Sequence, residues 1–507
     1  MSQENQNELP TEKLQSRTTS ILHNFWSETI SSIKSKFKTT NYSEKSLDIA
    51  LVVFLICLAM FIRVMLSYTF REEWGYGEGL VWNKSLIFNI SFNDPIHRSI
   101  EIRGFADFGY YYLSWVEGWY EGNWYPYQWH DEATVMDFYS YPPVFLYFLV
   151  LTWRPGMSNF WLAFPMVLAD AACTGVIYLI LKEIFKGQKA RGIGLIGGIL
   201  MAIAPINVIY DGIYWLNPGP VTLLTIIAFY FAIKKKWWQA FFWLAVATMT
   251  KQNALFFAYP IFMVMLGEKV RNKPIKEAAI ESIANALLFV FVGILLSIPW
   301  LFISPYQYVR HMLFPGRSIE LRFDVVDPVS NDCVSFAKSL EQMGFPNWIL
   351  AITSFGNYSM FWMILSASVI AIFMLWRSYN NKMDNVEFFN WIAMYTIFTH
   401  IFMPRGVYKF YTAYFVPMIL VALLGSLVKM TAKEEFLPMG IITGGVLFLG
   451  FNIWLIIMQR FPVPFYLFMV ALFIGLLTWF RAYFSDRKKK GISNERFMKF
   501  LESKIGS

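Results

Sequence analysis

The stretch LDIALVVFLICLAMFIRVMLSY, residues 47–68, decides the fold class. It is almost wholly apolar, and it matches the roughly 20 residues that a helix needs to cross the hydrocarbon core of a bilayer. Across the 507-residue chain, 56% of the residues are apolar and only 15% are charged, whereas about a quarter of an average soluble protein is charged. The charges gather in short clusters between long apolar runs. The sequence therefore predicts an all-α polytopic membrane protein.

Apolar runs of this kind recur along the chain and predict about twelve transmembrane helices, within a range of eleven to thirteen. The predicted spans are 47–68, 160–185, 192–209, 217–233, 237–250, 254–268, 280–303, 358–377, 387–403, 409–428, 437–458 and 463–483. Several are shorter than a full crossing. The run YPPVFLYFLVLTW (141–153) is ambiguous, and we interpret it as a helix that lies in the interface or dips in and returns.

The basic residues give a topology, because their clusters all fall on one face when the N-terminus is placed inside. These clusters lie at 34–45, 182–191, 234–236, 269–276, 377–382, 429–433 and 487–490. The positive-inside bias makes that face cytoplasmic, so the net charge of +8 does not require a nucleic-acid partner. An even number of spans places both termini in the cytoplasm. The membrane would be the cell membrane of a bacterium or archaeon, or the ER membrane of a eukaryote.

The predicted organisation is a polar tail (1–46), a transmembrane bundle (47–483) and a short basic tail (484–507). Apolar residues at helical spacing in the first tail predict an amphipathic helix on the membrane surface, with a partly disordered tail as the alternative. Two long segments then face outward. The first outer loop, 69–159, is acidic and contains interfacial helices, and the second covers 304–357.

Two basic motifs stand at the outer boundary. TKQNALFFAYP contains Lys251 and Gln252, and MPRGVYKFYTAYF contains Arg405 and Lys409. Each precedes a span that runs inward, so each lies at a helix N-terminus, where unpaired N–H groups and the helix dipole favour an anion. A cationic spot beside lipid suits a phosphate whose ester tail lies among acyl chains, which is a polyprenyl phosphate. The alternative is that these side chains snorkel and anchor the outer interface.

Two aspartates complement these cations. Asp107 lies in ADFGYYYLSW, and Asp211 lies in IYDGIYWLNPGP between the third and fourth predicted spans. Glycosyl transfer needs a base that takes the proton of the acceptor hydroxyl and a positive group that stabilises the departing phosphate. We predict Asp107 as the base and Asp211 as a second, orienting acid. The alternative for Asp107 is a solvated loop carboxylate.

Aromatic residues surround Asp107 in the sequence. Rings at the water–lipid boundary suit sugar faces and isoprenoid chains, although an interfacial aromatic belt is the alternative. The predicted substrate cavity is lined by Tyr111, Tyr112, Trp115 and Tyr141.

A metal ion is a weaker possibility. WHDEATVMD offers His130, Asp131 and Asp137 as ligands for a divalent ion, but their spacing matches no closed site and favours solvated charge. We therefore expect no required cofactor.

The order of these motifs resembles the GT-C glycosyltransferases, which are polytopic enzymes that use polyprenyl-phosphate-linked sugars. ADFGYYYLSWVEGWYEGNWYPY followed by YPPVFLYF is closest to the polyprenol-phosphate-mannose-dependent mannosyltransferases. YDGIYWLNPGP followed by TKQNALFFAYP is similar to the dolichyl-phosphate-glucose-dependent glucosyltransferases. The resemblance covers residues 47–430. It implies a GT-C fold, Asp107 as catalytic base, the Lys251 and Arg405/Lys409 regions as donor-phosphate contacts, and the first outer loop as part of the active-site roof.

The sequence thus predicts a membrane enzyme that moves a hexose, mannose or glucose, from a polyprenyl or dolichyl phosphate to a lipid-linked or surface glycan on the non-cytoplasmic face. The competing class is a polytopic transporter or lipid flippase. A transporter is expected to have ionisable groups or broken helices near the midplane, often in matching halves. Arg63, Asp170 and His400 are the few candidates inside predicted spans, and the two halves show no symmetry. A non-catalytic scaffold is a third possibility.

Overall fold

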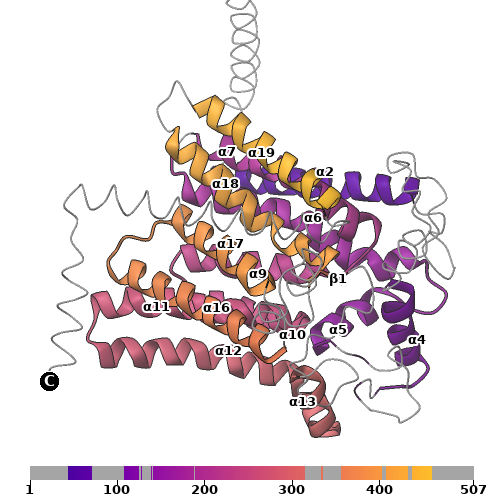
Figure 1. Ribbon diagram of the computed structural model, residues 1–507. Coiled ribbons are helices and arrows are strands. Elements are labelled where there is room, and N and C mark those ends of the chain that lie inside the picture. The colour runs from indigo at the N-terminus through magenta and orange to yellow at the C-terminus, as the bar shows by residue number, and fades with distance from the viewer. Residues whose placement is uncertain are drawn as a thin grey trace, which may run out of the picture. The chain divides into compact units, whose positions relative to one another are not determined.

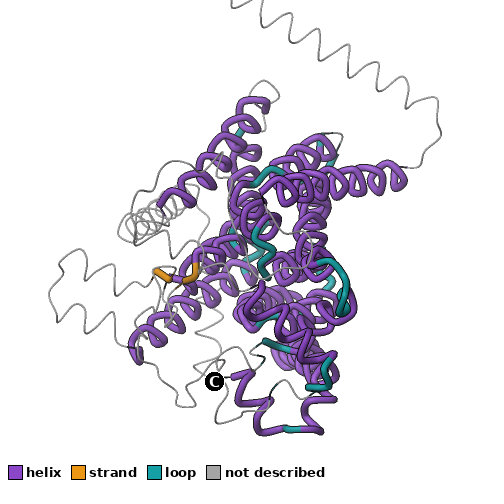
Figure 2. Tube along the Cα trace, turned by 90° about the vertical axis from the view of Figure 1, so that its right-hand side faces the viewer, coloured by secondary structure: helices purple, strands orange, loops and turns teal. Residues whose placement is uncertain are grey.

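The computed structural model describes residues 44–70, 108–124, 127, 139, 141–187, 189–313, 333–334, 356–401, 407–431 and 437–458. The chain divides into two units, Met1–Leu51 and Val52–Ser507, and every contact given below lies within the second. The regular secondary structure of the described residues is helical apart from one short antiparallel pair, in which β1 (Cys333–Val334) pairs with β2 (Val407–Tyr408) (Figures 1 and 2). The prediction of an all-α architecture is thus confirmed for the described part.

The elements follow one another in a simple order along the chain. They are α2 (Glu44–Phe70), η1 (Phe108–Leu113), α4 (Ser114–Tyr120), α5 (Pro143–Thr152), α6 (Asn159–Ile184), α7 (Ala190–Ala202), α8 (Pro205–Asn207), η2 (Val208–Ile213), α9 (Pro218–Ile233), α10 (Trp237–Thr250), η3 (Gln252–Phe257), α11 (Ala258–Asn272), α12 (Ile275–Ile303), α13 (Pro305–Leu313), α16 (Gly356–Tyr379), α17 (Asn385–Ile401), η4 (Lys409–Tyr414), α18 (Val416–Met430) and α19 (Leu437–Met458).

Each predicted span that falls on described residues coincides with a helix or with a pair of consecutive helical segments. The span 463–483, residues 1–43 and 484–507, and most of the loop 304–357 lie outside the described residues. The ambiguous run at 141–153 becomes α5, a helix of 10 residues. At 1.5 Å per residue it is roughly 15 Å long, about half the thickness of a hydrocarbon core. This length fits a helix that lies in the interface or dips in and returns.

Five of the described helical segments are long and apolar enough to cross a membrane, judged by length and composition. They are Glu44–Tyr68, Asn159–Ile184, Gln252–Asn272, Ile275–Ile303 and Leu437–Ile456. A sixth is possible if Ala190–Ala202 and Pro205–Ile213, which meet at an angle of 41°, form one broken span. The break falls just before Pro205, as expected because proline disfavours helical geometry in the residue that precedes it. The protein therefore has the helices of a membrane protein.

The distribution of side chains is that of a protein surrounded by lipid. Large apolar residues of α12 and α19 point outward: Phe291 is 61% exposed and Val446 is 65% exposed. Charged and polar residues such as Arg63, Asp170 and Asn207 are instead completely buried. A soluble protein has few large exposed apolar patches. In a bilayer, apolar side chains outside and paired polar groups inside are the favourable arrangement.

Glycines allow the closest helix contacts. A Cβ atom at Gly194 of α7 would lie 2.8 Å from the Tyr178 carbonyl oxygen of α6, and one at Gly267 of α11 would lie 2.5 Å from the Leu375 carbonyl oxygen of α16. Small residues let the backbones of membrane helices approach each other, because dispersion contacts drive their association in lipid. The pairs α6–α7, α6–α9 and α11–α16 are accordingly among the most extensively packed of the described helices (Figure 1).

Gly219, near the start of α9, gives a testable case. A Cβ atom there would lie 2.6 Å from the Met166 carbonyl oxygen of α6, which belongs to backbone and cannot rotate away. We expect Gly219→Ala to lower the free energy of unfolding by about 1–3 kcal/mol, as overpacking does in other proteins. Gly192→Ala is the matched control, because its Cβ would meet no atom within 4 Å. Thermal unfolding in detergent measures both, and equal stability of the two variants would contradict the close approach.

The basic segments meet at one end of the bundle. Nζ of Lys234 lies 3.4 Å from Oε2 of Glu183 at the end of α6. Nζ of Lys235 lies 2.7 Å from Oε2 of Glu268 near the end of α11. Arg271, in the last turn of α11, donates to the Ser378 carbonyl oxygen at 3.2 Å. This hydrogen bond joins the end of α11 to the end of α16. Four of the seven clusters, those at 182–191, 234–236, 269–276 and 377–382, are thus neighbours in space.

Candidate active site

The centre of the candidate site is Lys251, which lies at the opposite end of α10 from the basic segments. The 14 residues of α10 separate it from Lys236, a distance of about 21 Å by the helical rise. Lys251 has an extended backbone between α10 and the 3₁₀ turn η3, and its side chain is only 3% exposed. A buried ammonium group is costly unless other groups solvate it, so the surroundings of Lys251 decide its role.

Three tyrosine rings and one amide surround the ammonium group. The Nζ atom of Lys251 lies 4.5 Å from the ring centroid of Tyr411, 5.1 Å from that of Tyr141 and 5.5 Å from that of Tyr414. It also donates a hydrogen bond of 2.8 Å to Oδ1 of Asn217. Aromatic faces attract a cation without neutralising it. This cage therefore surrounds the Lys251 side chain with an amide and three ring faces in a place that is largely shielded from solvent.

The cage joins segments that are distant in the sequence. Tyr141 precedes α5, whereas Tyr411 and Tyr414 belong to η4, directly before α18. Asn217 links them: its Nδ2 donates to the Tyr141 hydroxyl at 2.9 Å, and its Oδ1 accepts from Tyr414 at 3.3 Å as well as from Lys251. The motifs around Lys251 and Lys409 each occupy a turn that leads into a helix, as the sequence predicts, and the two turns meet at one point.

The backbone around Asn217 is strained. Trp215 has a φ angle of 59°, in the left-handed region that a bulky residue rarely adopts. Its ring is completely buried, 5.1 Å from Phe108 and 6.2 Å from Phe160 between ring centroids. Strain of this kind costs about 1–3 kcal/mol and persists only where the surroundings impose it. Packing of Trp215 therefore holds Asn217 at the start of α9, facing Lys251.

The segment before α5 reaches the same place through η1, a π-helical turn that begins at Phe108, the residue after Asp107. Such turns are rare and frequently occur at functional sites. Beyond Phe108, Tyr112 and Trp115 are buried among other rings: Tyr112 lies 5.1 Å from Phe145 of α5 between ring centroids. They support the loop against α5. Their predicted role in lining a cavity, and that of the half-buried Tyr111, stays a prediction.

Two further tyrosines fix the turn that presents Tyr141. The hydroxyl of Tyr127 donates to the carbonyl oxygen of Tyr141 at 2.8 Å, and that of Tyr139 donates to the carbonyl oxygen of Pro142 at 2.8 Å. Burial raises the pKa of both phenols well above the ordinary value. Both phenols therefore remain protonated at neutral pH and keep these hydrogen bonds, so the Tyr141 ring is held beside Lys251 across the physiological pH range.

Asp211 lies in a buried polar network rather than in an open loop. It belongs to the π-helical turn η2, and its Oδ1 accepts the Gly219 N–H of α9 at 2.9 Å. Its Oδ2 accepts from Asn207 at 3.3 Å, and Asn207 also donates to Asp170 at 2.9 Å. Asp170 in turn accepts from Arg63 of α2 at 2.5 Å. The network thus connects α2, α6 and η2 to the start of α9.

Arg63 supplies the positive charge of this network. It is completely buried and also donates to the carbonyl oxygens of Ala59 and Ala202, each at 3.1 Å. We expect Arg63→Met to lower the free energy of unfolding by about 3–5 kcal/mol, because it removes the cationic partner of the buried Asp170 side chain and leaves only the Asn207 amide. Thermal unfolding in detergent measures this. The double variant Arg63→Met/Asp170→Leu should recover much of the loss, and an unchanged stability in the single variant would contradict the pairing.

Several predicted residues cannot be placed. Asp107, Arg405 and the weak metal candidates His130, Asp131 and Asp137 lie outside the described residues, as does the side chain of Lys409. Gln252 opens η3 directly after Lys251 and is half-buried. Within the described part of the chain, no three His, Cys, Asp or Glu side chains are grouped in a way that would hold a metal ion.

Four polar or aromatic residues of the site have no assigned role in the sequence-based prediction: Asn207, Asn217, Tyr411 and Tyr414. The sequence does contain a signal for Asn217. Asparagine is common as the N-cap residue of a helix, and proline is common at the first helical position that follows. Asn207 stands four residues before Asp211, which places both on one face of a helical turn. The tyrosines lie within the motif of Lys409, where an interfacial belt explains such rings equally well.

Comparison with known proteins adds no assignment at this point. The chain matches no protein-family model, and no characterised protein resembles it significantly in sequence.

Proposed function

We propose that the protein is a membrane glycosyltransferase of GT-C type that moves a hexose from a polyprenyl-phosphate donor to a lipid-linked or surface glycan. The observation that carries this proposal is the burial of Lys251 inside a tyrosine cage at one end of an apolar helix bundle. A cation held in such a place suits a phosphate that is attached to a lipid chain. The segments that resemble the family converge there: Phe108 packs on Trp215, and Tyr141, Asn217 and Tyr411 surround Lys251.

The proposed topology has twelve spans with both termini in the cytoplasm. The end that carries Lys234 and Lys235 faces the cytoplasm, in keeping with the positive-inside bias. Lys251, at the far end of α10, then faces the exterior of the cell or the ER lumen. The short helices α4, α5 and α13 gather at this outer end, where they share one aromatic cluster. Tyrosine and tryptophan rings are favoured in the interface between lipid and water.

The proposed reaction is a single displacement. The oxygen of an acceptor hydroxyl attacks the anomeric carbon, its proton passes to the carboxylate of Asp107, and the bond between the anomeric carbon and the phosphate oxygen breaks. The polyprenyl phosphate leaves with one more negative charge than it carried as the donor diester. Lys251, together with Arg405 and Lys409, stabilises that charge as it develops, which is the part of binding that accelerates the reaction. The configuration at the anomeric carbon inverts.

Asp211 acts in this scheme as a positioning residue. Its hydrogen bond to the Gly219 N–H fixes the first turn of α9, and Asn217 stands directly before that turn. Asn217 orients both Lys251 and Tyr141. Gln252, next to Lys251, is the further proposed contact to the donor phosphate. Tyr111 and Tyr141 would face the sugar or the first isoprene units.

A second function, transport of a lipid or ion, is favoured by one specific observation. Arg63, Asp170, Asn207 and Asp211 form a buried ionisable network inside the bundle, and ionisable groups at such positions often mark a substrate or proton pathway. Sugar transfer by detergent-solubilised protein separates the two functions, because transport requires two compartments whereas a transferase does not.

The proposal is tested by incubating the purified protein with a series of polyprenyl-phosphate sugars and glycan acceptors, with and without EDTA. We expect a glycosylated product from a mannosyl or glucosyl donor, and equal activity in EDTA because the proposed leaving-group stabilisers are cationic side chains. Activity that needs an added divalent ion would instead place the acidic residues near His130 in the reaction. No product from any donor, combined with substrate flux in liposomes, would favour the transporter.

A further inference from the structure

The polar network inside the bundle contains two carboxyl groups but only one cation. Asp170, Asp211 and Arg63 are all completely buried. Nε of Arg63 lies 2.5 Å from Oδ2 of Asp170. Asp211 instead accepts from two neutral groups, the Gly219 N–H at 2.9 Å and the Asn207 amide at 3.3 Å. The attraction of Arg63 for Asp211 is opposed by the repulsion from Asp170. If both carboxyl groups are ionised, the network therefore carries one uncompensated negative charge.

No second cation of the described part pairs with Asp211. Lys251 donates to the Asn217 amide, and Asp211 makes no ion pair with any of the described residues. Cys173 and Tyr414 are the other titratable side chains that interact with Asp211, and a thiol or a phenol cannot supply a positive charge. An unpaired carboxylate is so unfavourable in an apolar interior that such a group is neutralised instead.

The surroundings of the Asn207 amide also favour a neutral carboxyl group. Its Nδ2 atom lies 2.9 Å from Oδ1 of Asp170, 3.3 Å from Oδ2 of Asp211 and 3.4 Å from the Ala413 carbonyl oxygen. An amide nitrogen carries two hydrogens, so it cannot fully satisfy three acceptors. A proton on Oδ2 of Asp211 removes the conflict, because a hydroxyl oxygen does not need the amide as its donor.

The same amide has a buried acceptor that lacks a donor. Oδ1 of Asn207 is shielded from solvent and has no hydrogen-bond partner among the described residues. A buried acceptor without a donor is unfavourable. A protonated Asp211 adds a donor beside this amide, whereas an ionised Asp211 adds only another acceptor. The unmatched acceptor and the unmatched charge are thus both relieved by one hydrogen.

We propose that Asp211 binds one proton and is a neutral carboxylic acid in the folded protein at neutral pH. Its carbonyl oxygen, Oδ1, accepts the Gly219 N–H, and its hydroxyl oxygen, Oδ2, carries the proton beside Asn207. Asp170 remains the carboxylate that pairs with Arg63, so the network as a whole is neutral. The bound proton is a property of the buried network and does not depend on sugar transfer.

Infrared spectroscopy tests the proposal, because the carbonyl stretch of a carboxylic acid is separate from the bands of a carboxylate. The purified full-length protein is measured at about pH 9, where exposed carboxyl groups are ionised, in a detergent without carbonyl groups. We expect a carboxylic-acid band in the wild type and its loss in Asp211→Asn. Isotope-labelled aspartate should shift the band of the wild type. A wild type without this band would overturn the proposal.

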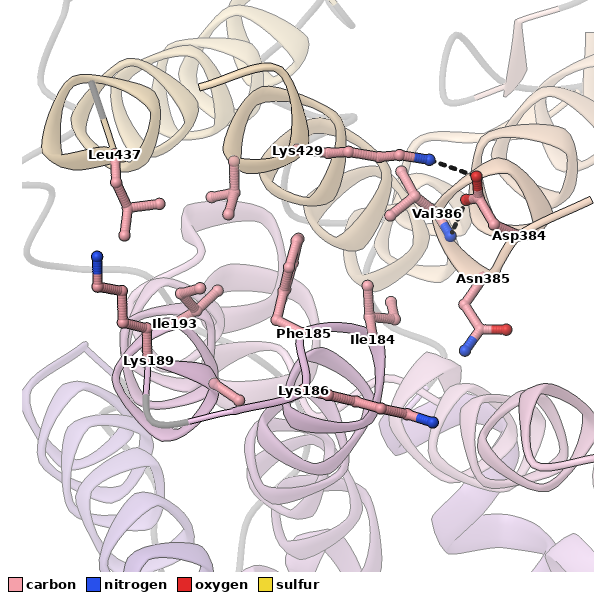
Figure 3. A pocket seen from close by; sticks show the side chains of 12 residues that line it. Ile184, Phe185, Lys186, Lys189, Ile193, Asp384, Asn385, Val386, Lys429 and Leu437 are labelled. Atoms are coloured by element: carbon pink, nitrogen blue, oxygen red, sulfur yellow. Dashed lines mark hydrogen bonds and ion pairs between the residues drawn. The ribbon is translucent and has the colours of Figure 1, made fainter. Parts of the chain in front are cut away.

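Two further variants assign the band. Asp384→Asn is the matched control, because it removes an exposed carboxyl group that pairs with Lys429 beside the cavity at the end of the bundle that carries Lys234 (Figure 3). It should keep the band. The double variant Arg63→Met/Asp170→Leu should also keep it, because Asp211 stays buried without a cation. Loss of the band in the double variant would place the proton on Asp170, and persistence of the band in Asp211→Asn would likewise overturn the assignment.

Discussion

Replacing Asp107 by asparagine is expected to lower sugar transfer by about 10²–10⁴-fold, the usual contribution of a positioned general base. The amide keeps the size of the side chain but cannot accept the proton of the acceptor hydroxyl. The loss should appear in kcat, while the affinity for the donor stays close to that of the wild type. The rate of product formation at saturating donor, together with donor binding to the same preparation, measures both effects.

The matched control for Asp107 is Glu121→Gln, which removes an acidic charge from the same predicted loop at an exposed position after α4. This variant should retain full activity. Comparable turnover in Asp107→Asn and the wild type would exclude Asp107 as the base. A similar loss of turnover in both variants would mean that the total negative charge of the loop matters, rather than the carboxylate of Asp107.

Replacing Lys251 by methionine is expected to lower kcat/KM for the polyprenyl-phosphate donor by about hundredfold or more. Losing one partner of a buried, charge-assisted contact costs roughly 2–5 kcal/mol, and Lys251 is 3% exposed. Methionine fills a similar volume, so the tyrosine rings keep a neighbour. Binding of the free polyprenyl phosphate should suffer more than binding of the sugar-bearing donor, because the phosphate that leaves carries the larger charge.

The control for Lys251 is Lys236→Met, an exposed lysine at the other end of α10. It should bind the donor as the wild type does. A thermal unfolding curve of Lys251→Met in detergent separates loss of binding from loss of the fold. If that variant is folded and binds polyprenyl phosphate normally, the phosphate lies elsewhere and the proposed site is wrong.

Most of the helix positions could be predicted from the sequence, since an apolar run in a membrane leaves the backbone no partner but its own helix. The positions of the breaks could be predicted less well. The predicted span 192–209 is divided at Ile203 and Ala204, before Pro205, and the motif of Lys251 opens with a 3₁₀ turn rather than a regular helix. Such breaks depend on the neighbours that satisfy the freed backbone groups, and no local pattern specifies those neighbours.

The candidate site could be predicted in part. The sequence alone indicates Lys251, because a charged side chain next to an apolar span is energetically unfavourable in a membrane and is often functional. That it meets Tyr141 and Tyr411 requires the packing of α5 and η4 against α9 and α10, which is a property of the whole bundle. The role of Asn217 could not be predicted for the same reason, because its hydrogen-bond partners come from three separate segments.

Photo-crosslinking can locate the lipid-linked phosphate that we propose to bind at Lys251. A polyprenyl phosphate that carries a photoreactive group on its first isoprene unit would be irradiated with the purified protein and the labelled peptides sequenced. Labels should fall on the peptides that contain Tyr141, Asn217 and Tyr411, and should decrease strongly in Lys251→Met. Labelling confined to the end that carries Lys186 and Lys429, and unchanged in Lys251→Met, would show that the lipid phosphate does not bind at Lys251.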